Sequence, residues 1–143
     1  MIHRDLKPAN VMVGAFAEVQ VMDWGLAKLL PEPSPTAGSV EEPSTQHNIR
    51  EPVSAEDTAP GSILGTPAFM PPEQARGEIG LLDERADVFA LGAILCVILT
   101  GRAPYAGGAG SPLTRAQEGD LANARAGLAS CGADAELVQL TLT

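Results

Sequence analysis

The chain has 143 residues, of which 45% are hydrophobic and 19% charged, and its formal net charge is −9 at pH 7. This hydrophobic content is enough for one buried core. The acidic balance, with no stripe of basic residues, argues against nucleic-acid binding because phosphates repel such a surface. Two cysteines are too few for a disulfide scaffold, and we expect both to be free thiols.

Residues 3–10 read HRDLKPAN and fill the spacing H-R-D-x-x-x-x-N. Asp5 offers a carboxylate, a group that can accept a proton, and Asn10 offers an amide oxygen, a group that can contact a magnesium ion. Lys7 stands two residues after Asp5, where an ammonium group can neutralise negative charge that develops during a reaction. A match at this many positions makes chance a poor explanation.

Two short apolar runs, VMV and VQVM, flank residues 14–18 and predict a β-hairpin. The hairpin would present Asn10 and Asp23 together at its strand ends, on a rigid support. Asp23 opens the triplet Asp23-Trp24-Gly25, in which the glycine would let the backbone turn. Taken alone, the triplet is equally consistent with an ordinary turn, and only its position behind the first pattern distinguishes it.

Residues 31–60 are rich in proline, serine, threonine and glutamate, a composition that favours disorder. This insert holds six acidic residues and one arginine, so it carries five of the nine net negative charges. Such an insert could repel acidic substrates or mimic a substrate. We keep the simpler interpretation that it is a solvated spacer.

The third pattern, GTPAFMPPE, contains Thr66 and ends in Glu73, and the fourth, DVFALG, begins at Asp87. An uncharged run follows at 88–99. Because a membrane-spanning helix needs about twenty apolar residues, this run is predicted to be a core helix, with Gly101 as its C-terminal cap. In isolation, Asp87 could also be an acid that the helix dipole favours at the start of a helix.

Three further helices are predicted at 113–118, 120–129 and 133–142, where apolar residues recur at spacings of three and four. The chain opens with charged residues, so no signal peptide is expected. No segment is long enough to span a membrane. A cytoplasmic location is therefore the default expectation.

Taken in order, the four patterns resemble the catalytic loop, the D-F-G motif, the end of the activation segment and the central helix of protein kinases. With Lys7 two residues after Asp5, the catalytic-loop pattern resembles that of the serine/threonine branch of the family. The resemblance implies an α+β fold, namely the C-terminal lobe of a kinase, mainly α-helical with a small β-hairpin. The implied divisions of the partial domain 1–143 are a catalytic loop at 3–10, an activation segment at 23–73 with its insert at 31–60, and the central and following helices at 84–143.

The resemblance implies a kinase that transfers the γ-phosphoryl group of ATP to serine or threonine hydroxyls of a protein substrate, with Mg²⁺ as the metal. Asp5 would orient the hydroxyl and accept its proton, and Lys7 would contact the phosphoryl group. Asn10 and Asp23 would hold the magnesium ion on ATP. Thr66 would form hydrogen bonds toward Asp5 and Lys7.

Other residues would brace this site. The resemblance implies that the carboxylate of Asp87 accepts hydrogen bonds from the catalytic-loop backbone and so braces His3 and Arg4. Glu73 would pair with an arginine that comes late in the family's domain, and we expect this chain to stop before it.

Two features concern regulation. Trp24 replaces the family's phenylalanine, and its larger ring and N–H group need room and a partner. Thr58 and Ser62 are candidate phosphorylation sites, since a phosphate there would give Arg4 a dianionic partner and order the segment. Other hydroxyls of the insert, such as those of Ser34 and Thr45, are equally accessible on composition.

The 143 residues contain no G-x-G-x-x-G loop, no V-A-I-K lysine and no partner glutamate helix. We therefore expect a large-lobe fragment without the small lobe, with negligible activity alone because catalysis here depends on positioning ATP. Two alternatives are a noncatalytic docking module with a kinase-like fold, and a gene remnant that exposes apolar surface. The intact Asp5, Asn10 and Asp23 argue against the docking module.

Overall fold

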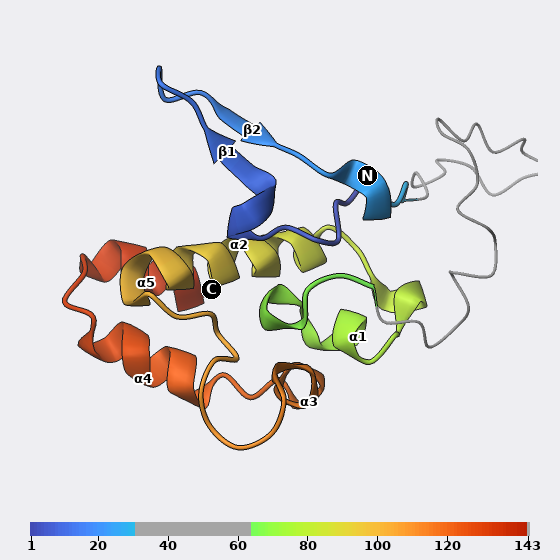
Figure 1. Ribbon diagram of the computed structural model, residues 1–143. Helices are drawn as coiled ribbons and strands as arrows, with labels where there is room; N and C mark the ends of the chain where they lie inside the picture. Colours follow the sequence, from blue (N-terminus) through green and yellow to red (C-terminus); the bar gives the residue numbers. More distant parts are fainter. Residues whose placement is uncertain (31–63, 143) are drawn as a thin grey trace, which may run out of the picture.

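The computed structural model describes residues 1–30 and 64–142. These residues form one two-stranded antiparallel sheet and five α-helices, joined by loops and short 3-10 turns (Figure 1). A mainly helical chain with one small hairpin is confirmed. The helices are α1 at Pro72–Ala75, α2 at Arg85–Thr100, α3 at Pro112–Glu118, α4 at Ala122–Ser130 and α5 at Ala135–Leu142.

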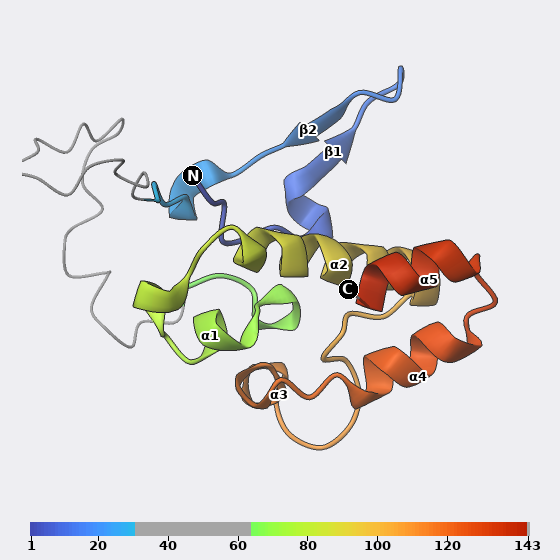
Figure 2. The same ribbon diagram turned by 180° about the vertical axis from the view of Figure 1, so that it is seen from behind.

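The predicted hairpin consists of β1 at Val11–Val13 and β2 at Val19–Val21, with Val11 opposite Val21. It projects from the helices in both views (Figures 1 and 2). Phe16, at its tip, is 94% exposed, and the side chains of both strands are largely exposed as well. The hairpin is therefore held by its own ladder and turn rather than by packing against the described helices.

Helix α2 lies at the centre of the fold, between the hairpin side and the smaller helices (Figures 1 and 2). Gly101 ends it in the left-handed conformation, as predicted, and donates its N–H to the Val97 carbonyl at 2.8 Å. The prediction of a core helix holds for one face only. That face carries small buried residues at helical spacing, whereas larger apolar side chains of the same run are exposed: the buried set is Ala86, Ala90, Ala93 and Cys96, and the exposed set is Val88, Leu91 and Ile98.

Helices α4 and α5 each begin two residues later than the periodicity predicts. Asp120 accepts a hydrogen bond from the Ala122 N–H at 3.1 Å, and Asp134 accepts one from the Glu136 N–H at 2.8 Å. Aspartate side chains that bond to the backbone two residues on favour a turn over a helix. The first turn of each helix therefore follows the aspartate.

The main core cluster joins α1, α3 and the loop after α2 around Tyr105, which is 1% exposed. Its ring stacks on Phe89 of α2 with 6.2 Å between the ring centroids. The hydroxyl of Tyr105 is buried and has no hydrogen-bond partner among the described residues. A second, smaller cluster joins Ile2 to the start of α2.

Replacing Tyr105 with phenylalanine is expected to raise the free energy of unfolding by about 1 kcal/mol, because a buried hydroxyl without a partner is costly. Burial also raises the pKa of the Tyr105 hydroxyl to about 12. Between pH about 10, the value for an unfolded chain, and the folded value, only the unfolded chain has lost this proton. The stability that the raised pKa of Tyr105 provides is therefore fully present below this pH window. It is lost as the pH rises through the window.

Urea unfolding of both proteins between pH 7 and 12 measures both effects. The phenylalanine variant should lack the tyrosine part of the alkaline decline, while the lysines and cysteines affect both proteins equally. A variant that is less stable by 1 kcal/mol or more at pH 7 would show that the hydroxyl has a partner after all.

Candidate active site

The start of the chain is tied to the turn after β2 by an antiparallel bridge between Ile2 and Lys28. The Ile2 N–H donates to the Lys28 carbonyl at 2.8 Å, and the Lys28 N–H donates back at 2.9 Å. The ammonium group of Lys28 also donates to the Ile79 carbonyl at 3.0 Å. These bonds fix the entry to residues 3–10 against the body of the protein.

Asp87, in the first turn of α2, holds the backbone of this loop. Its two carboxylate oxygens accept the His3 N–H at 2.6 Å and the Arg4 N–H at 3.0 Å. Arg4 has φ of 69°, in the left-handed region that residues other than glycine rarely adopt. Its guanidinium Nε donates to the Leu26 carbonyl, and burial lowers the pKa of Arg4. The contact expected of Asp87 is therefore present.

His3 packs behind the loop and is 2% exposed. Its Nδ1 lies 3.3 Å from the Asp5 N–H, which donates to it, and its Nε2 lies 3.0 Å from the Met22 carbonyl. A donor on one side and an acceptor on the other select the neutral tautomer with hydrogen on Nε2. The imidazole thus links the loop to the end of β2.

Trp24 has the room and the partner that its indole needs. The Nε1–H donates to the Val21 carbonyl at 3.0 Å, and the ring lies tilted on His3 with 4.7 Å between the ring centroids. The ring is half exposed. A phenylalanine would make the ring contact without the hydrogen bond, so the tryptophan adds a backbone tie next to Asp23 and Gly25.

Asp5, Lys7 and Thr66 meet at one point, although the last lies on a distant part of the chain. The Lys7 ammonium lies 2.7 Å from Asp5 Oδ2 and donates to Thr66 Oγ1 at 2.8 Å. Asp5 Oδ1 accepts the Thr66 N–H at 2.9 Å. Both charged side chains are part-buried, which strengthens their attraction relative to a surface pair. A carboxylate, an ammonium and a hydroxyl group therefore form one connected network.

Asn10 lies in the 3-10 turn Pro8–Asn10 that leads into β1, and it is buried. Its Nδ2 donates to the Asp5 carbonyl at 2.9 Å and lies 3.4 Å from Asp5 Oδ2. Because both partners are acceptors, the amide nitrogen must face Asp5. The amide oxygen of Asn10 is consequently left as an acceptor for another group.

Asp23 stands just beyond β2, next to Asn10 through the backbone bond from the Met22 N–H to the Asn10 carbonyl at 2.9 Å. It has φ of 59° and precedes the 3-10 turn Trp24–Leu26. Its carboxylate makes no hydrogen bond or ion pair with any other residue in 1–30 or 64–142. An amide oxygen and a free carboxylate fit Mg²⁺, which takes one or two protein oxygens together with substrate phosphates.

Residues 1–30 and 64–142 hold no larger cluster suited to another metal. Within the described parts of the chain, no three His, Cys, Asp or Glu side chains gather as they would around a metal ion. The thiols of Cys96 and Cys131 are both free, as expected.

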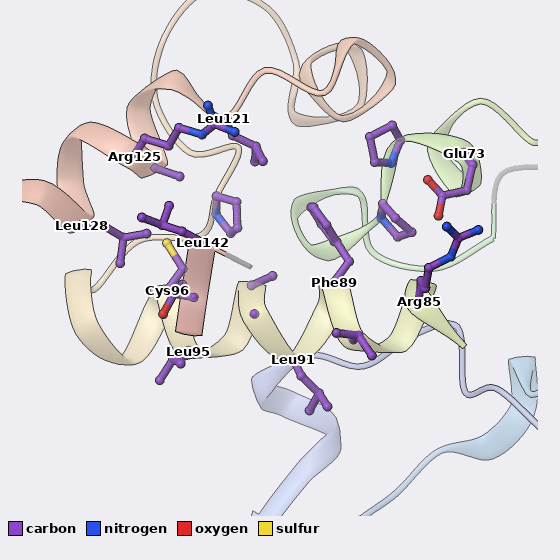
Figure 3. Close-up of a pocket in the computed structure, with 18 of the residues that line it drawn as sticks. Glu73, Arg85, Phe89, Leu91, Leu95, Cys96, Leu121, Arg125, Leu128 and Leu142 are labelled. Carbon is purple, nitrogen blue, oxygen red and sulfur yellow. The ribbon is translucent and has the colours of Figure 1, made fainter. Parts of the chain in front are cut away.

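The remaining candidate residues do not join the network. Thr58 and Ser62, with the insert at 31–60, lie outside the described residues. Glu73 is part-buried and makes no ion pair with any residue that the structure describes; Arg85 pairs with Asp83 instead, at 2.7 Å. Figure 3 shows the Arg85 side chain pointing toward Glu73 at one end of a cavity.

That cavity has a volume of about 1090 Å³ and lies among α1, α2, α4 and α5 (Figure 3). Apolar side chains such as Phe89 and Leu128 line most of it. It contains none of Asp5, Lys7 and Asn10. The cavity is large, but it lacks these three residues and is therefore not the candidate active site. The candidate active site is the network around Asp5.

Sequence reasoning missed Gln74, a buried glutamine on α1 that donates to the Arg4 carbonyl at 2.6 Å. A single polar residue in a short helix leaves no periodic signal. Its position directly after the GTPAFMPPE pattern was the one available hint.

The comparisons with known proteins identify the family of the chain. The family model described as "Protein kinase domain" matches residues 1–126, so the chain belongs to the protein kinase family. The chain is 39% identical over 107 residues to serine/threonine-protein kinase PknB of Mycolicibacterium smegmatis, covering 75% of this chain and 14% of that protein. It is 37% identical over 108 residues to serine/threonine-protein kinase PknD of Protochlamydia amoebophila, covering 73% and 10%.

A third relative, serine/threonine-protein kinase PknD of Chlamydia caviae, is 39% identical over 107 residues. The chain spans only 10% to 14% of the length of these relatives. None of the helices in the described residues is both long and apolar enough to cross a membrane.

Proposed function

We propose that the chain is the large-lobe part of a serine/threonine protein kinase, whose complete form transfers the γ-phosphoryl group of magnesium ATP to protein hydroxyls. The observation that carries this proposal is the bridge that Lys7 makes between Asp5 and Thr66, at 2.7 and 2.8 Å. The bridge places a carboxylate that can accept the proton of a hydroxyl group beside the positive charge of the Lys7 ammonium group.

In this proposal each member of the network has a separate part. Asp5 orients the substrate hydroxyl and takes its proton, and Lys7 stabilises charge on the phosphoryl group. The N–H of Thr66 fixes one oxygen of Asp5, so the other oxygen faces Lys7 and the approaching hydroxyl. Asn10 and Asp23 would hold Mg²⁺ through their free oxygens. Bound magnesium ATP would supply the phosphoryl group and neutralise its charge.

We also propose that the chain alone has negligible activity. Its residues include no G-x-G-x-x-G loop to cover the ATP phosphates and no V-A-I-K lysine. The strands of the hairpin next to Asn10 and Asp23 are exposed. Such exposure is expected of a surface that the small lobe covers in a complete kinase. Positioning of ATP would therefore be incomplete, and positioning supplies most of this catalysis.

A fluorescence titration tests the nucleotide site on the chain itself. Trp24 is the sole tryptophan and lies beside Asp23. Magnesium ATP should change its emission at concentrations of about 1 mM or above, since only part of the pocket is present. The Asp23→Asn variant should respond much less, and ATP without Mg²⁺ should have little effect on either protein. Equal responses of the two proteins would reject the proposed metal ligand.

The same samples, supplied with ATP labelled on the γ-phosphate and a serine- and threonine-containing protein, should transfer no label above the Asp5→Asn background. Robust transfer by the chain alone would reject the proposal that it is incompetent. A folded chain with no nucleotide response would favour the docking alternative. Failure to melt cooperatively in a circular dichroism experiment would favour the gene remnant. Translation of the DNA upstream of the Met1 codon would show whether the missing motifs are encoded there.

A further inference from the structure

Gln74 connects two segments that the candidate active site needs in register. It lies on α1 and is 6% exposed. Its Nε2 donates to the Arg4 carbonyl at 2.6 Å and to the Leu64 carbonyl at 2.9 Å. Both partners are acceptors, so the amide nitrogen must face them, and both of its hydrogens are used.

The first bond acts on a strained part of the catalytic loop. Arg4 is held at φ of 69°, and such a conformation persists only where the surroundings fix it. Asp87 holds the N–H of Arg4, and Gln74 holds its carbonyl. That carbonyl belongs to the peptide group that leads into Asp5. The orientation of this peptide group therefore depends on Gln74.

The second bond acts on the segment that carries Thr66. The Leu64 carbonyl belongs to the peptide group that leads into Gly65, which has φ of 112°. A Cβ atom on Gly65 would lie 3.2 Å from both the Arg4 carbonyl oxygen and Gln74 Nε2. The two backbones therefore approach closely at this point, with the amide of Gln74 between their carbonyls.

We propose that Gln74 is a positioning residue that couples the catalytic loop to residues 64–66, an inference that deepens and rests on the proposed kinase function. By holding one carbonyl on each segment, Gln74 keeps Asp5 Oδ1 at 2.9 Å from the Thr66 N–H. The carboxylate is thereby aimed before any protein hydroxyl arrives. Gln74 acts through Asp5 and Thr66 and does not touch the reacting atoms.

Two substitutions separate this role from simple packing. Gln74→Glu keeps the shape but replaces both donors with a carboxylate that faces two carbonyl oxygens. Gln74→Met keeps the length and removes all polar atoms. The matched control is Gln117→Glu, because Gln117 also donates from Nε2 to a backbone carbonyl, that of Ala75, at 3.0 Å. Gln117 lies on α3 and contacts neither Arg4 nor Leu64.

Hydrogen exchange measured by NMR on the 143-residue chain reads the coupling directly. The amide hydrogens of Arg4 and Thr66 donate to Asp87 and Asp5, so their protection reports whether both segments are held. After correction for global stability, both Gln74 variants should lose protection at these two amides by about tenfold or more. Gln117→Glu should leave both within about twofold of the parent protein.

A pH series adds a readout that packing alone would not give. A buried carboxyl facing two carbonyls favours its neutral form, so the pKa of a glutamate at position 74 should be raised. As the pH falls through this raised value, the neutral carboxyl can donate one hydrogen. The stability deficit of Gln74→Glu should therefore shrink in acid, whereas that of Gln74→Met should stay unchanged.

The inference would be overturned if both Gln74 variants protected the amides of Arg4 and Thr66 to within about twofold of the Gln117→Glu control. If Gln74→Glu does not fold, Gln74→Met decides the matter by the same two amides. None of these measurements requires phosphoryl transfer. The coupling could therefore be found even if the proposed kinase function were rejected. If the coupling were not found, the fluorescence response to magnesium ATP would still test the proposed function separately.

Discussion

Replacing Asp87 with asparagine is expected to lower the free energy of unfolding by about 3 kcal/mol. The carboxylate accepts two adjacent backbone N–H groups, from His3 at 2.6 Å and from Arg4 at 3.0 Å. An asparagine offers one oxygen and turns an NH₂ group toward the second donor. One backbone N–H is then left without a partner in a part-buried site, and the remaining bond loses its charge assistance. Urea unfolding at pH 7 measures the difference.

Glu84→Gln is the matched control, since Glu84 precedes α2 and its side chain is exposed. This control removes a charge near the same helix end without touching residues 3–10, and it should change stability by less than about 0.5 kcal/mol. A loss below 1 kcal/mol in Asp87→Asn would contradict the expectation. It would mean that the backbone of the loop, including the left-handed Arg4, is held by other contacts.

The local structure near the site could be predicted because its signals are short in range. The hairpin follows from two apolar runs around a turn, and the end of α2 follows from Gly101, which adopts positive φ. Asp5, Lys7 and Asn10 lie within one short segment, so their proximity follows from the chain itself. The convergence of Thr66 and Asp87 on that segment came from the family resemblance, since periodicity carries no information on distant contacts.

Other parts could not be predicted, for physical reasons. An uncharged run such as 88–99 has no polar face, so it does not tell which side of the helix is buried. The structure buries its small residues, which allow close packing, and leaves Leu91 and Ile98 exposed. Gln74 and Arg115 are single buried polar residues that donate to backbone carbonyls, and Arg115 pairs with Asp120 as well. Every residue carries a carbonyl, so such a partner leaves no mark in the sequence.

Arg115 is a buried polar residue that we expect to stabilise the fold substantially. It lies on α3 and is 3% exposed, and its Nε lies 3.1 Å from Asp120 Oδ2. One terminal nitrogen donates to the carbonyls of Tyr105 and Ala106, at 3.1 and 3.3 Å. The side chain thus joins the end of α3 to the loop that places Tyr105 in the core. No periodic pattern singled it out.

Replacing Arg115 with methionine, which keeps a long apolar stem, should lower the free energy of unfolding by about 3 kcal/mol. The buried Tyr105 carbonyl loses its donor, while the cost of unpairing Asp120 is moderated because that side chain is 40% exposed. Arg76→Met is the control, since Arg76 also donates to a backbone carbonyl, that of Gln117, but is exposed. It should cost less than about 1 kcal/mol.

The pH dependence of unfolding separates the two parts of the Arg115 effect. The N–H of Ala122 and then the Arg115 guanidinium hold the pKa of Asp120 below its usual value. A lowered folded pKa gives stability that is present above the unfolded value and is lost as the pH falls through the folded one. The methionine variant should therefore show a smaller acid decline than the parent protein, because only the Ala122 contribution remains. An unchanged decline would show that Arg115 stabilises the fold through the carbonyls of Tyr105 and Ala106 alone.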